Sequence, residues 1–260
     1  MGAVAVERTG SVAVVRMNKP ERMNTYDFEM GKELLEAVLA VGADAGVRCV
    51  VLTGTGRAFS AGGDVSMMGT FAEGAQSRFL DLTIQLHALI ASLRRCPKPV
   101  ISAVNGVAAG AGFSFALAGD IAVAAQSARF ALAYQNIGLS PDGGASYFLA
   151  RALGTQRSME LTLTGKTLSA EEAAAWGLVQ KVFPDDSFEA EVAALAAAIA
   201  SGPTLAYAKA KELYNRALCQ PLETHMEDER QRIAASSATA DFRDGVRAFL
   251  EKRRPEFRGK

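Results

Sequence analysis

The sequence has few of the residues that build disulfide scaffolds and metal centres. Its 260 residues include three cysteines, two histidines and one tryptophan. Cys49, Cys96 and Cys219 are widely spaced and form no C-x-x-C pair. This spacing excludes a disulfide framework and a four-cysteine zinc site, and it is typical of a protein in a reducing compartment. His87 and His225 are too few for a multi-histidine site. We therefore expect a protein without a metal centre.

The chain also lacks an excess of charge of either sign. Its 28 basic and 28 acidic residues give a formal net charge of +0 at pH 7. Such a balance argues against a protein that binds bulk nucleic acid or an anionic membrane surface. The apolar run before Glu7 is too short for the core of a signal peptide, so we expect a cytoplasmic protein.

One uncharged stretch, residues 100–119, is long enough to span a bilayer. Asn105, two serines and four glycines interrupt its apolar character. The pattern favours a strand, a turn and a helix over a single long helix. We therefore expect no membrane-spanning segment here.

Apolar periodicity predicts alternating strands and helices through most of the chain. A hydrophobic content of 49% and a charged content of 22% indicate a folded protein, and the length lies between that of one domain and two. The predicted strands are residues 3–7, 12–17, 48–53, 100–104, 121–125 and 179–183. The predicted helices among them are residues 26–43, capped by Asn24 or Thr25, then 79–93, 113–118 and 170–176. This alternation indicates an α/β fold with parallel strands.

The last part of the chain is predicted to be helical throughout. Helices are expected over residues 188–201, 205–218, 222–236 and 241–253. We therefore divide the chain into a body, residues 1–200, and a helical region, residues 201–260. An exposed apolar face on such a region often mediates assembly.

Two loops rich in small residues follow predicted strands. The first is AFSAGGDV, residues 58–65, and the second is NGVAAGAGF, residues 105–113. Small residues allow a ligand to approach backbone N–H groups closely, and two such loops can direct two donors at one oxygen. The same glycines could instead serve tight packing of strand on helix. A nucleotide-phosphate site is less favoured, because neither G-x-G-x-x-G nor the P-loop pattern is present.

Longer motifs resemble those of a known superfamily over essentially the whole chain. They are AFSAGGDV, PKPVISAVNGVAAGAG, LAGDIAVAA, IGLSPDGG, LTGKTLSAEEAAAWGLV and GVRAFLEKRRPEF. Together they resemble the enoyl-CoA hydratase/isomerase (crotonase) superfamily. The resemblance implies a spiral of ββα turns with a C-terminal helical trimerisation region. It also implies an acyl-CoA substrate, no tightly bound cofactor besides the coenzyme A of that substrate, and a homotrimer or a dimer of trimers.

The resemblance implies an oxyanion hole, and it shows that this sequence lacks two carboxylates that hydratases of the family have. The family's two backbone donors map onto the N–H groups of Gly63 and Ala111, the latter at a position that is usually glycine. Hydratases of the family place two glutamates where this chain has Ser114 and Tyr134. Neither side chain is an effective acid or base near neutral pH, so ordinary hydratase activity is not expected.

One carboxylate is expected near this site. Asp142 lies in SPDGG, which taken alone is a turn signature, but it matches the aspartate of double-bond isomerases, among them the ring-1,2-epoxyphenylacetyl-CoA isomerases. Burial against Phe130, Tyr134 and Ile137 is expected to raise its pKa. One carboxylate can move a proton between two carbons while the oxyanion hole holds the enolate. We therefore expect an enoyl-CoA double-bond isomerase.

Three alternatives stay open. The first is a hydratase with a variant site. The second is a hydrolase resembling the 4-chlorobenzoyl-CoA dehalogenases, which carry a histidine base in the register of His87 and a nucleophilic aspartate in that of Asp142. The third is a member of the family that binds acyl-CoA or RNA without catalysis.

The resemblance also implies where coenzyme A lies. Arg22 is placed to meet a phosphate, the backbone around residues 61–65 to hold the adenine, and two C-terminal residues to reach coenzyme A. The expected coenzyme A contacts are Arg22, Met23, Ala61, Gly62, Asp64, Val65, Phe249 and Lys252. An apolar pocket for the acyl group is expected from Phe71, Phe79, Leu82, Leu86 and Tyr134, and residues 66–77 are expected to cover it.

Overall fold

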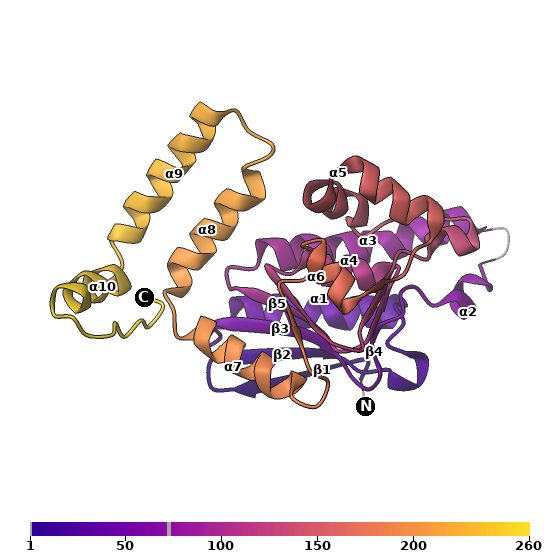
Figure 1. Cartoon of the computed structure of the whole chain (residues 1–260), viewed down its shortest axis with the longest axis horizontal. Coiled ribbons are helices and arrows are strands. Elements are labelled where there is room, and N and C mark those ends of the chain that lie inside the picture. The colour runs from indigo at the N-terminus through magenta and orange to yellow at the C-terminus, as the bar shows by residue number, and fades with distance from the viewer. Residues whose placement is uncertain (1, 72–73) are drawn as a thin grey trace.

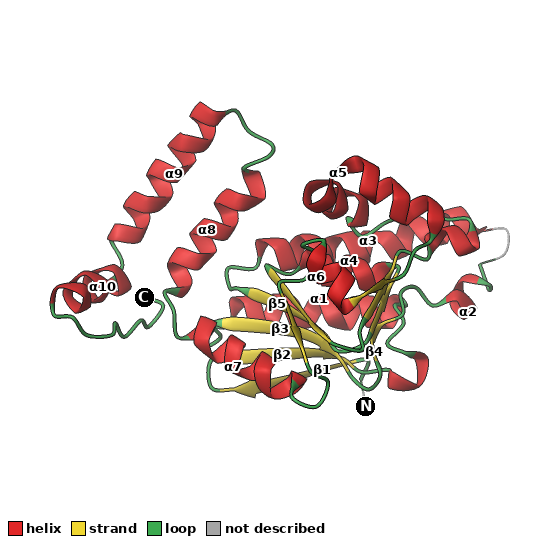
Figure 2. Ribbon diagram, viewed as in Figure 1, coloured by secondary structure: helices red, strands yellow, loops and turns green. Residues whose placement is uncertain are grey.

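A computed structural model describes residues 2–71 and 74–260. The predicted stretch 66–77 therefore includes two residues, 72 and 73, that lie outside the described part. The fold has a body of two sheets and surrounding helices, from which the last three helices extend to one side (Figures 1 and 2).

The larger sheet has six strands in the order β1-β2-β3-β5-β7-β10. The strands are β1 (Val4–Thr9), β2 (Val12–Met17), β3 (Cys49–Gly54), β5 (Val100–Val104), β7 (Ile121–Ala125) and β10 (Lys181–Phe183). Only β1 and β2 pair antiparallel, around the turn at Gly10; the other pairs are parallel. The central strands are β-branched or small and buried on both faces, as expected for a covered parallel sheet.

The smaller sheet has four short strands in the order β4-β6-β8-β9. These are β4 (Ala58–Ser60), β6 (Val107–Ala109), β8 (Arg129–Ala131) and β9 (Leu168–Ser169), of which only β8 and β9 pair antiparallel. Each strand of the larger sheet from β3 to β7 is followed by one of the smaller sheet and then by helix. The chain therefore repeats a ββα turn, which confirms the predicted α/β class.

Helices cover both sheets and close two apolar cores. The body helices are α1 (Phe28–Ala43), α2 (Val65–Met68), α3 (Ala75–Arg95), α4 (Ala111–Ala118), α5 (Ala145–Thr164), α6 (Ala170–Ala175) and α7 (Phe188–Ala200). The main core contains Phe59, Phe113, Phe115 and Phe130 and lies between the sheets and helices α1, α3 and α4. A second core lies where Phe188 and Val192 of α7 pack on the other face of the larger sheet.

The observed bounds correct several predictions. Helix α1 begins at Phe28, and its cap is Asp27, whose carboxylate accepts the N–H of Met30 at 2.8 Å; the predicted caps Asn24 and Thr25 were wrong. Helix α6 begins after Ser169, which forms a capping box with Glu172. Helix α5 was not predicted; Gly154 interrupts it with a φ of 75°.

Three helices form the C-terminal region, which begins after Pro203. They are α8 (Thr204–Arg216), α9 (Leu222–Ser237) and α10 (Ala240–Leu250). Helix α8 is fixed to the body by Lys211, whose ammonium donates to Leu93 O at 2.9 Å and lies 2.7 Å from Asp120 Oδ2. Helices α9 and α10 lie beyond α8, at the end of the molecule opposite to α2 (Figure 1).

No single described helix is both long and apolar enough to cross a membrane, although α7 and α8, bent by 98°, meet the criteria of length and composition as a pair.

Candidate active site

A mostly apolar cavity of about 230 Å³ lies where the two glycine-rich loops meet. Its lining is largely aliphatic and aromatic and contains a single carboxylate among the described residues, that of Asp142. The lining residues are Tyr26, Ala61, Gly63, Val65, Met68, Phe79, Leu82, Leu86, Gly110, Ala111, Leu132, Ala133, Tyr134, Asn136, Ile137, Leu139 and Asp142. Of the predicted acyl pocket, Phe79, Leu82, Leu86 and Tyr134 line this cavity, whereas Phe71 does not.

Two backbone N–H groups border the cavity without an acceptor. Gly63 follows β4, and its neighbours bond to Tyr26: Tyr26 N–H donates to Gly62 O at 2.7 Å and Asp64 N–H to Tyr26 O at 2.9 Å. Ala111 is the first residue of α4, where N–H groups have no partner within the helix. Neither N–H finds a hydrogen-bond acceptor within the described part of the chain. Two free donors at one apolar cavity form an arrangement that can stabilise a negative oxygen.

The glycines around these donors are required by close backbone approach. Gly62 has a φ of 90°, and a Cβ there would lie 2.7 Å from the carbonyl oxygen of Ala109. Gly112 lies against the backbone of Ser60, where a Cβ would collide. The two loops thus pack backbone to backbone, which holds Gly63 and Ala111 at the same cavity.

Asp142 lines the cavity from the turn before α5. Its Oδ1 accepts a hydrogen bond of 2.7 Å from the hydroxyl of Tyr134. Its backbone carbonyl accepts a bond of 3.0 Å from the hydroxyl of Ser114, which is fully buried. Ser114 therefore fixes the turn and does not reach the cavity, while Tyr134 contacts the carboxylate itself.

The electrostatics of the carboxylate follow from its surroundings. Burial raises the pKa of Asp142, as the sequence predicted, while the Tyr134 hydrogen bond and the charge of His87 act to lower it. Burial and the nearby Asp142 carboxylate both raise the pKa of Tyr134, so its hydroxyl stays protonated and acts as a donor. An aspartate with a raised pKa in an apolar cavity is suited to accept and return a proton.

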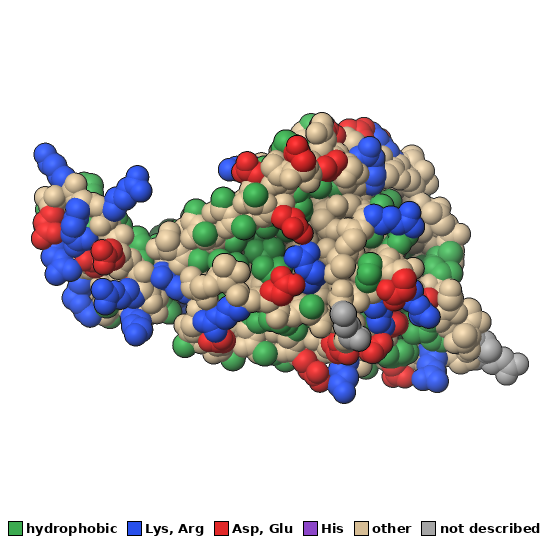
Figure 3. Space-filling model, turned by 90° about the horizontal axis from the view of Figure 1, so that it is seen from below, with side chains coloured by type: hydrophobic (Ala, Val, Ile, Leu, Met, Phe, Trp, Pro, Cys, Tyr) green, Lys and Arg blue, Asp and Glu red, His purple; other side chains and the backbone are tan. Residues whose placement is uncertain are grey.

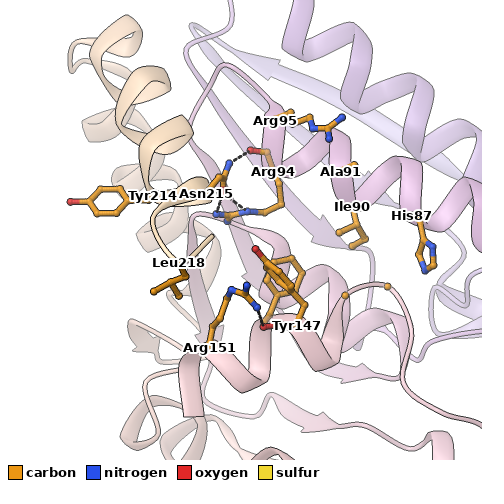
Figure 4. A pocket seen from close by; sticks show the side chains of 13 residues that line it. His87, Ile90, Ala91, Arg94, Arg95, Tyr147, Arg151, Tyr214, Asn215 and Leu218 are labelled. Atoms are coloured by element: carbon orange, nitrogen blue, oxygen red, sulfur yellow. Dashed lines mark hydrogen bonds between the residues drawn. The ribbon is translucent and has the colours of Figure 1, made fainter. Parts of the chain in front are cut away.

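His87 lies on the other side of the Asp142 turn, in a second cavity of about 610 Å³ between α3, α5 and α8 (Figure 4). Gly143 and Gly144 line this second cavity, as do the arginines at 94, 95 and 151. His87 is exposed and forms no hydrogen bond with Asp142, so it influences the carboxylate through its charge.

The predicted coenzyme A contacts divide into two groups. Ala61 and Val65 line the cavity, and Met23, Gly62 and Asp64 lie directly behind it. The guanidinium of Arg22 lies 3.0 Å from Asp64 Oδ2 and keeps 60% of its side chain exposed. Phe249, which is 83% exposed, lies on α10, and Lys252 follows that helix. Helix α10 lies at the end of the molecule opposite to α2 (Figure 1). One chain therefore does not bring these last two residues to the cavity.

Asn24 and Tyr26 were not predicted as part of the site. Both are buried, at 0% and 1% exposure, and both bond to the loop that carries Gly63. The sequence signal was present in KPERMNTY, where a polar Asn follows a turn, but it does not reveal the distant backbone groups that the side chain meets.

Comparisons with known proteins indicate one family. A family model described as "Enoyl-CoA hydratase/isomerase" matches residues 7–260. The chain is 40% identical to the 1,2-epoxyphenylacetyl-CoA isomerase of Escherichia coli (strain K12), over 96% of this chain and 95% of that one. It is 36% identical to 4-chlorobenzoyl coenzyme A dehalogenase-2 of Arthrobacter sp, over 96% of this chain and 91% of that one. The crystal structure of an enoyl-CoA hydratase from Polaromonas sp. JS666 superposes with a TM-score of 0.94 at 36% identity, covering 98% of this chain and all of that one.

Proposed function

Since the chain belongs to the enoyl-CoA hydratase/isomerase family, a family of crotonase-fold enzymes that act on acyl-CoA, we propose that it moves a carbon–carbon double bond in an acyl-CoA. The observation that supports this most is the single described carboxylate in the cavity, that of Asp142, which lines the same cavity as Gly63 and Ala111 with their free N–H groups. One carboxylate suffices for isomerisation, whereas hydration needs a base for water and an acid for carbon.

The proposed reaction is one proton moved between two carbons. The Asp142 carboxylate removes a proton from the carbon next to the thioester, and the electron pair moves onto the thioester oxygen. The N–H groups of Gly63 and Ala111 hold the resulting oxyanion. The carboxylic acid then returns the same proton two carbons further along the chain, and the electrons return to form the conjugated double bond. No water is added, and no tightly bound cofactor is needed.

Tyr134 has a defined part in this step. Its hydroxyl occupies Oδ1 of Asp142, which leaves Oδ2 to carry the proton. It also stabilises the ionised form, which must predominate before the substrate proton is removed. Tyr134 thus orients the base and keeps it charged.

A dehalogenase-like hydrolysis is the second candidate, and one observation favours it. His87 is close enough to Asp142 for its charge to lower the pKa of the carboxyl, and one similar protein is a 4-chlorobenzoyl coenzyme A dehalogenase. In that reaction the carboxylate would attack the ring carbon and expel chloride, and water would then release the product from the ester. The exposed position of His87 in a separate cavity makes this the minor candidate.

Coenzyme A is proposed to bind between two copies of this chain. The apolar side chains of the C-terminal region are strongly exposed, among them Leu222, Ile233, Phe249 and Leu250 at 67% or more. Basic side chains gather at the same end of the molecule (Figure 3), where Arg243, Arg247, Lys252, Arg253, Arg254 and Arg258 are exposed. In a homotrimer, or a dimer of trimers, a neighbour's α10 would bring Phe249 and Lys252 to the coenzyme A. Phe249→Asp should then yield monomers in analytical ultracentrifugation and weaken coenzyme A binding.

The proposed enzymatic role is tested with Asp142→Asn. The variant should bind an acyl-CoA with the wild-type affinity in calorimetry and lose turnover by roughly a hundredfold or more. A wild-type protein that binds acyl-CoA but converts no enoyl-, aryl- or ring-epoxide thioester would favour a binding protein instead. A variant that keeps wild-type turnover would exclude Asp142 as the acid and base.

A further inference from the structure

The loop that carries the Gly63 N–H has no regular structure of its own. Residues 61–64 connect β4 to the short helix α2. A backbone donor contributes to catalysis only when it is held in place before the charge on the substrate oxygen develops. The groups that hold this loop therefore matter as much as the donor itself.

The loop is fixed by the segment 19–26, which lies behind it. Ala61 N–H donates to Met23 O at 2.9 Å, and the Tyr26 backbone bonds to the residues on both sides of Gly63. The hydroxyl of Ser60 donates to Asn24 O at 2.8 Å and accepts the N–H of Gly62 at 3.3 Å. These bonds immobilise both neighbours of Gly63 and leave its own N–H free.

Asn24 is the residue on which the shape of this segment depends. Its side chain is fully buried, and its amide donates to Thr55 O at 3.0 Å and to Ala58 O at 2.8 Å, while its Oδ1 accepts Lys19 N–H at 2.9 Å. The side chain thus ties the start of the segment to the strand β4 that leads into the Gly63 loop.

The backbone at this point is strained. Met23 and Asn24 have φ values of 53° and 54°, two consecutive left-handed residues without glycine. Asparagine tolerates this conformation better than most residues, but a methionine beside it does not. Such strain persists only where surrounding bonds impose it, and it is concentrated at functional sites.

From these contacts we propose that Asn24 is a positioning residue of the oxyanion hole, which sets the direction of the Gly63 N–H through the segment 19–26. The inference rests on the proposed function, in which Gly63 N–H holds the thioester oxygen. Asn24 touches no substrate atom; it acts through the backbone of residues 58–64.

The test uses the absorbance of a bound aryl-thioester of coenzyme A, 4-hydroxybenzoyl-CoA. Hydrogen bonds to the thioester oxygen polarise the conjugated system and shift its absorbance to longer wavelength. Asn24→Asp retains the size and the acceptor for Lys19 N–H but loses both donors; Asn24→Gly retains the left-handed backbone but loses the side chain. Both variants should lose most of the red shift and lower kcat by roughly ten- to a hundredfold with little change in KM.

Asn215→Ala is the matched control. The Asn215 amide donates to Arg94 O at 2.7 Å and joins α8 to α3; its side chain lines the second cavity and not the one between the glycine-rich loops. It should lower the Tm and leave the red shift unchanged. If the Asn24 variants do not fold, Ser60→Ala, which removes only the bonds of one hydroxyl, should reduce the shift in the same direction.

The outcomes separate the two claims. Folded Asn24 variants, or a folded Ser60→Ala, with the full red shift and wild-type kcat would overturn the role of Asn24 and leave the proposed function intact. A wild-type protein that binds the thioester without any red shift would overturn the oxyanion hole and, with it, this inference.

Discussion

Replacement of Tyr134 by phenylalanine tests the relation between the hydroxyl and the carboxylate. The variant keeps the buried ring, which is 8% exposed, and removes only the 2.7 Å hydrogen bond to Asp142 Oδ1. A hydrogen bond to a charged group stabilises by about 1.5–3 kcal/mol, and about 1.36 kcal/mol corresponds to a factor of ten. At pH values where the Asp142 carboxyl is mostly protonated, its ionised fraction should therefore be roughly ten- to a hundredfold smaller in the variant than in the wild type.

The variant should therefore lose kcat/KM to a degree that depends on pH. The hydrogen bond lowers the pKa of Asp142, so its removal raises that pKa and moves the acid limb of kcat/KM to higher pH. On the acid limb kcat/KM should fall roughly ten- to a hundredfold, and on the plateau it should fall much less. The assay is the pH profile of isomerisation, with Tyr214→Phe, an exposed tyrosine of α8, as the control. An equal fractional loss at every pH would refute the reasoning.

Three further predictions concern stability and the oxyanion hole. Because burial raises the pKa of Asp142, its charged form destabilises the fold at pH values above that pKa, and this destabilisation disappears as the pH falls through the pKa. Asp142→Asn should therefore raise the Tm at neutral pH and lose this advantage in acid. An unchanged Tm at pH 7 would contradict the predicted sign. Ala111→Pro removes an N–H at the first helical position, where proline is tolerated, and should lower kcat roughly a hundred- to a thousandfold. Ala111→Gly keeps the N–H, so its kcat should stay near that of the wild type. Equal effects of the two substitutions would argue against a donor at Ala111. Lys211→Met removes the buried ammonium that bonds to Leu93 O and Asp120, while Asp120 keeps Arg94 at 3.5 Å, so the free energy of unfolding should fall by about 1–3 kcal/mol in urea titrations. The exposed Lys32→Met should change it little.

The sequence predicted the larger sheet well, because its central strands are runs of β-branched and small residues that are buried on both faces. It did not predict the smaller sheet, whose strands have two or three residues each and therefore no readable period. Helix α5 was missed because Gly154 interrupts it and its apolar face is weak. The cap of α1 was misplaced because Asn24, Thr25 and Asp27 are all capping residues, and only the tertiary bonds of Asn24 distinguish it from Asp27.

The candidate site was predicted in part, because some of its residues lie in recognisable local motifs and others meet only through the fold. Glycine loops and the aspartate of SPDGG are local signals, and the structure brings Gly63, Ala111, Tyr134 and Asp142 to one cavity. The hydrogen bond from Tyr134 to Asp142 depends on how the turn before α5 folds back, and Ser114 helps to set that turn. The ion pair of Arg22 with Asp64 was not foreseen, since it spans 42 residues of sequence. Contacts of this kind follow from topology and not from spacing along the chain.

The most direct test of the central claim is a paired assay on the purified protein with two substrates. A 3-enoyl-CoA and crotonyl-CoA are followed by the absorbance of the conjugated enoyl thioester and by mass spectrometry for added water. A site with one carboxylate, Asp142, predicts that conjugation appears from the 3-enoyl-CoA without a gain of water and that crotonyl-CoA is unchanged. Loss of the crotonyl-CoA absorbance with the gain of one water would contradict the account, because it would show that this cavity activates water without a second carboxylate.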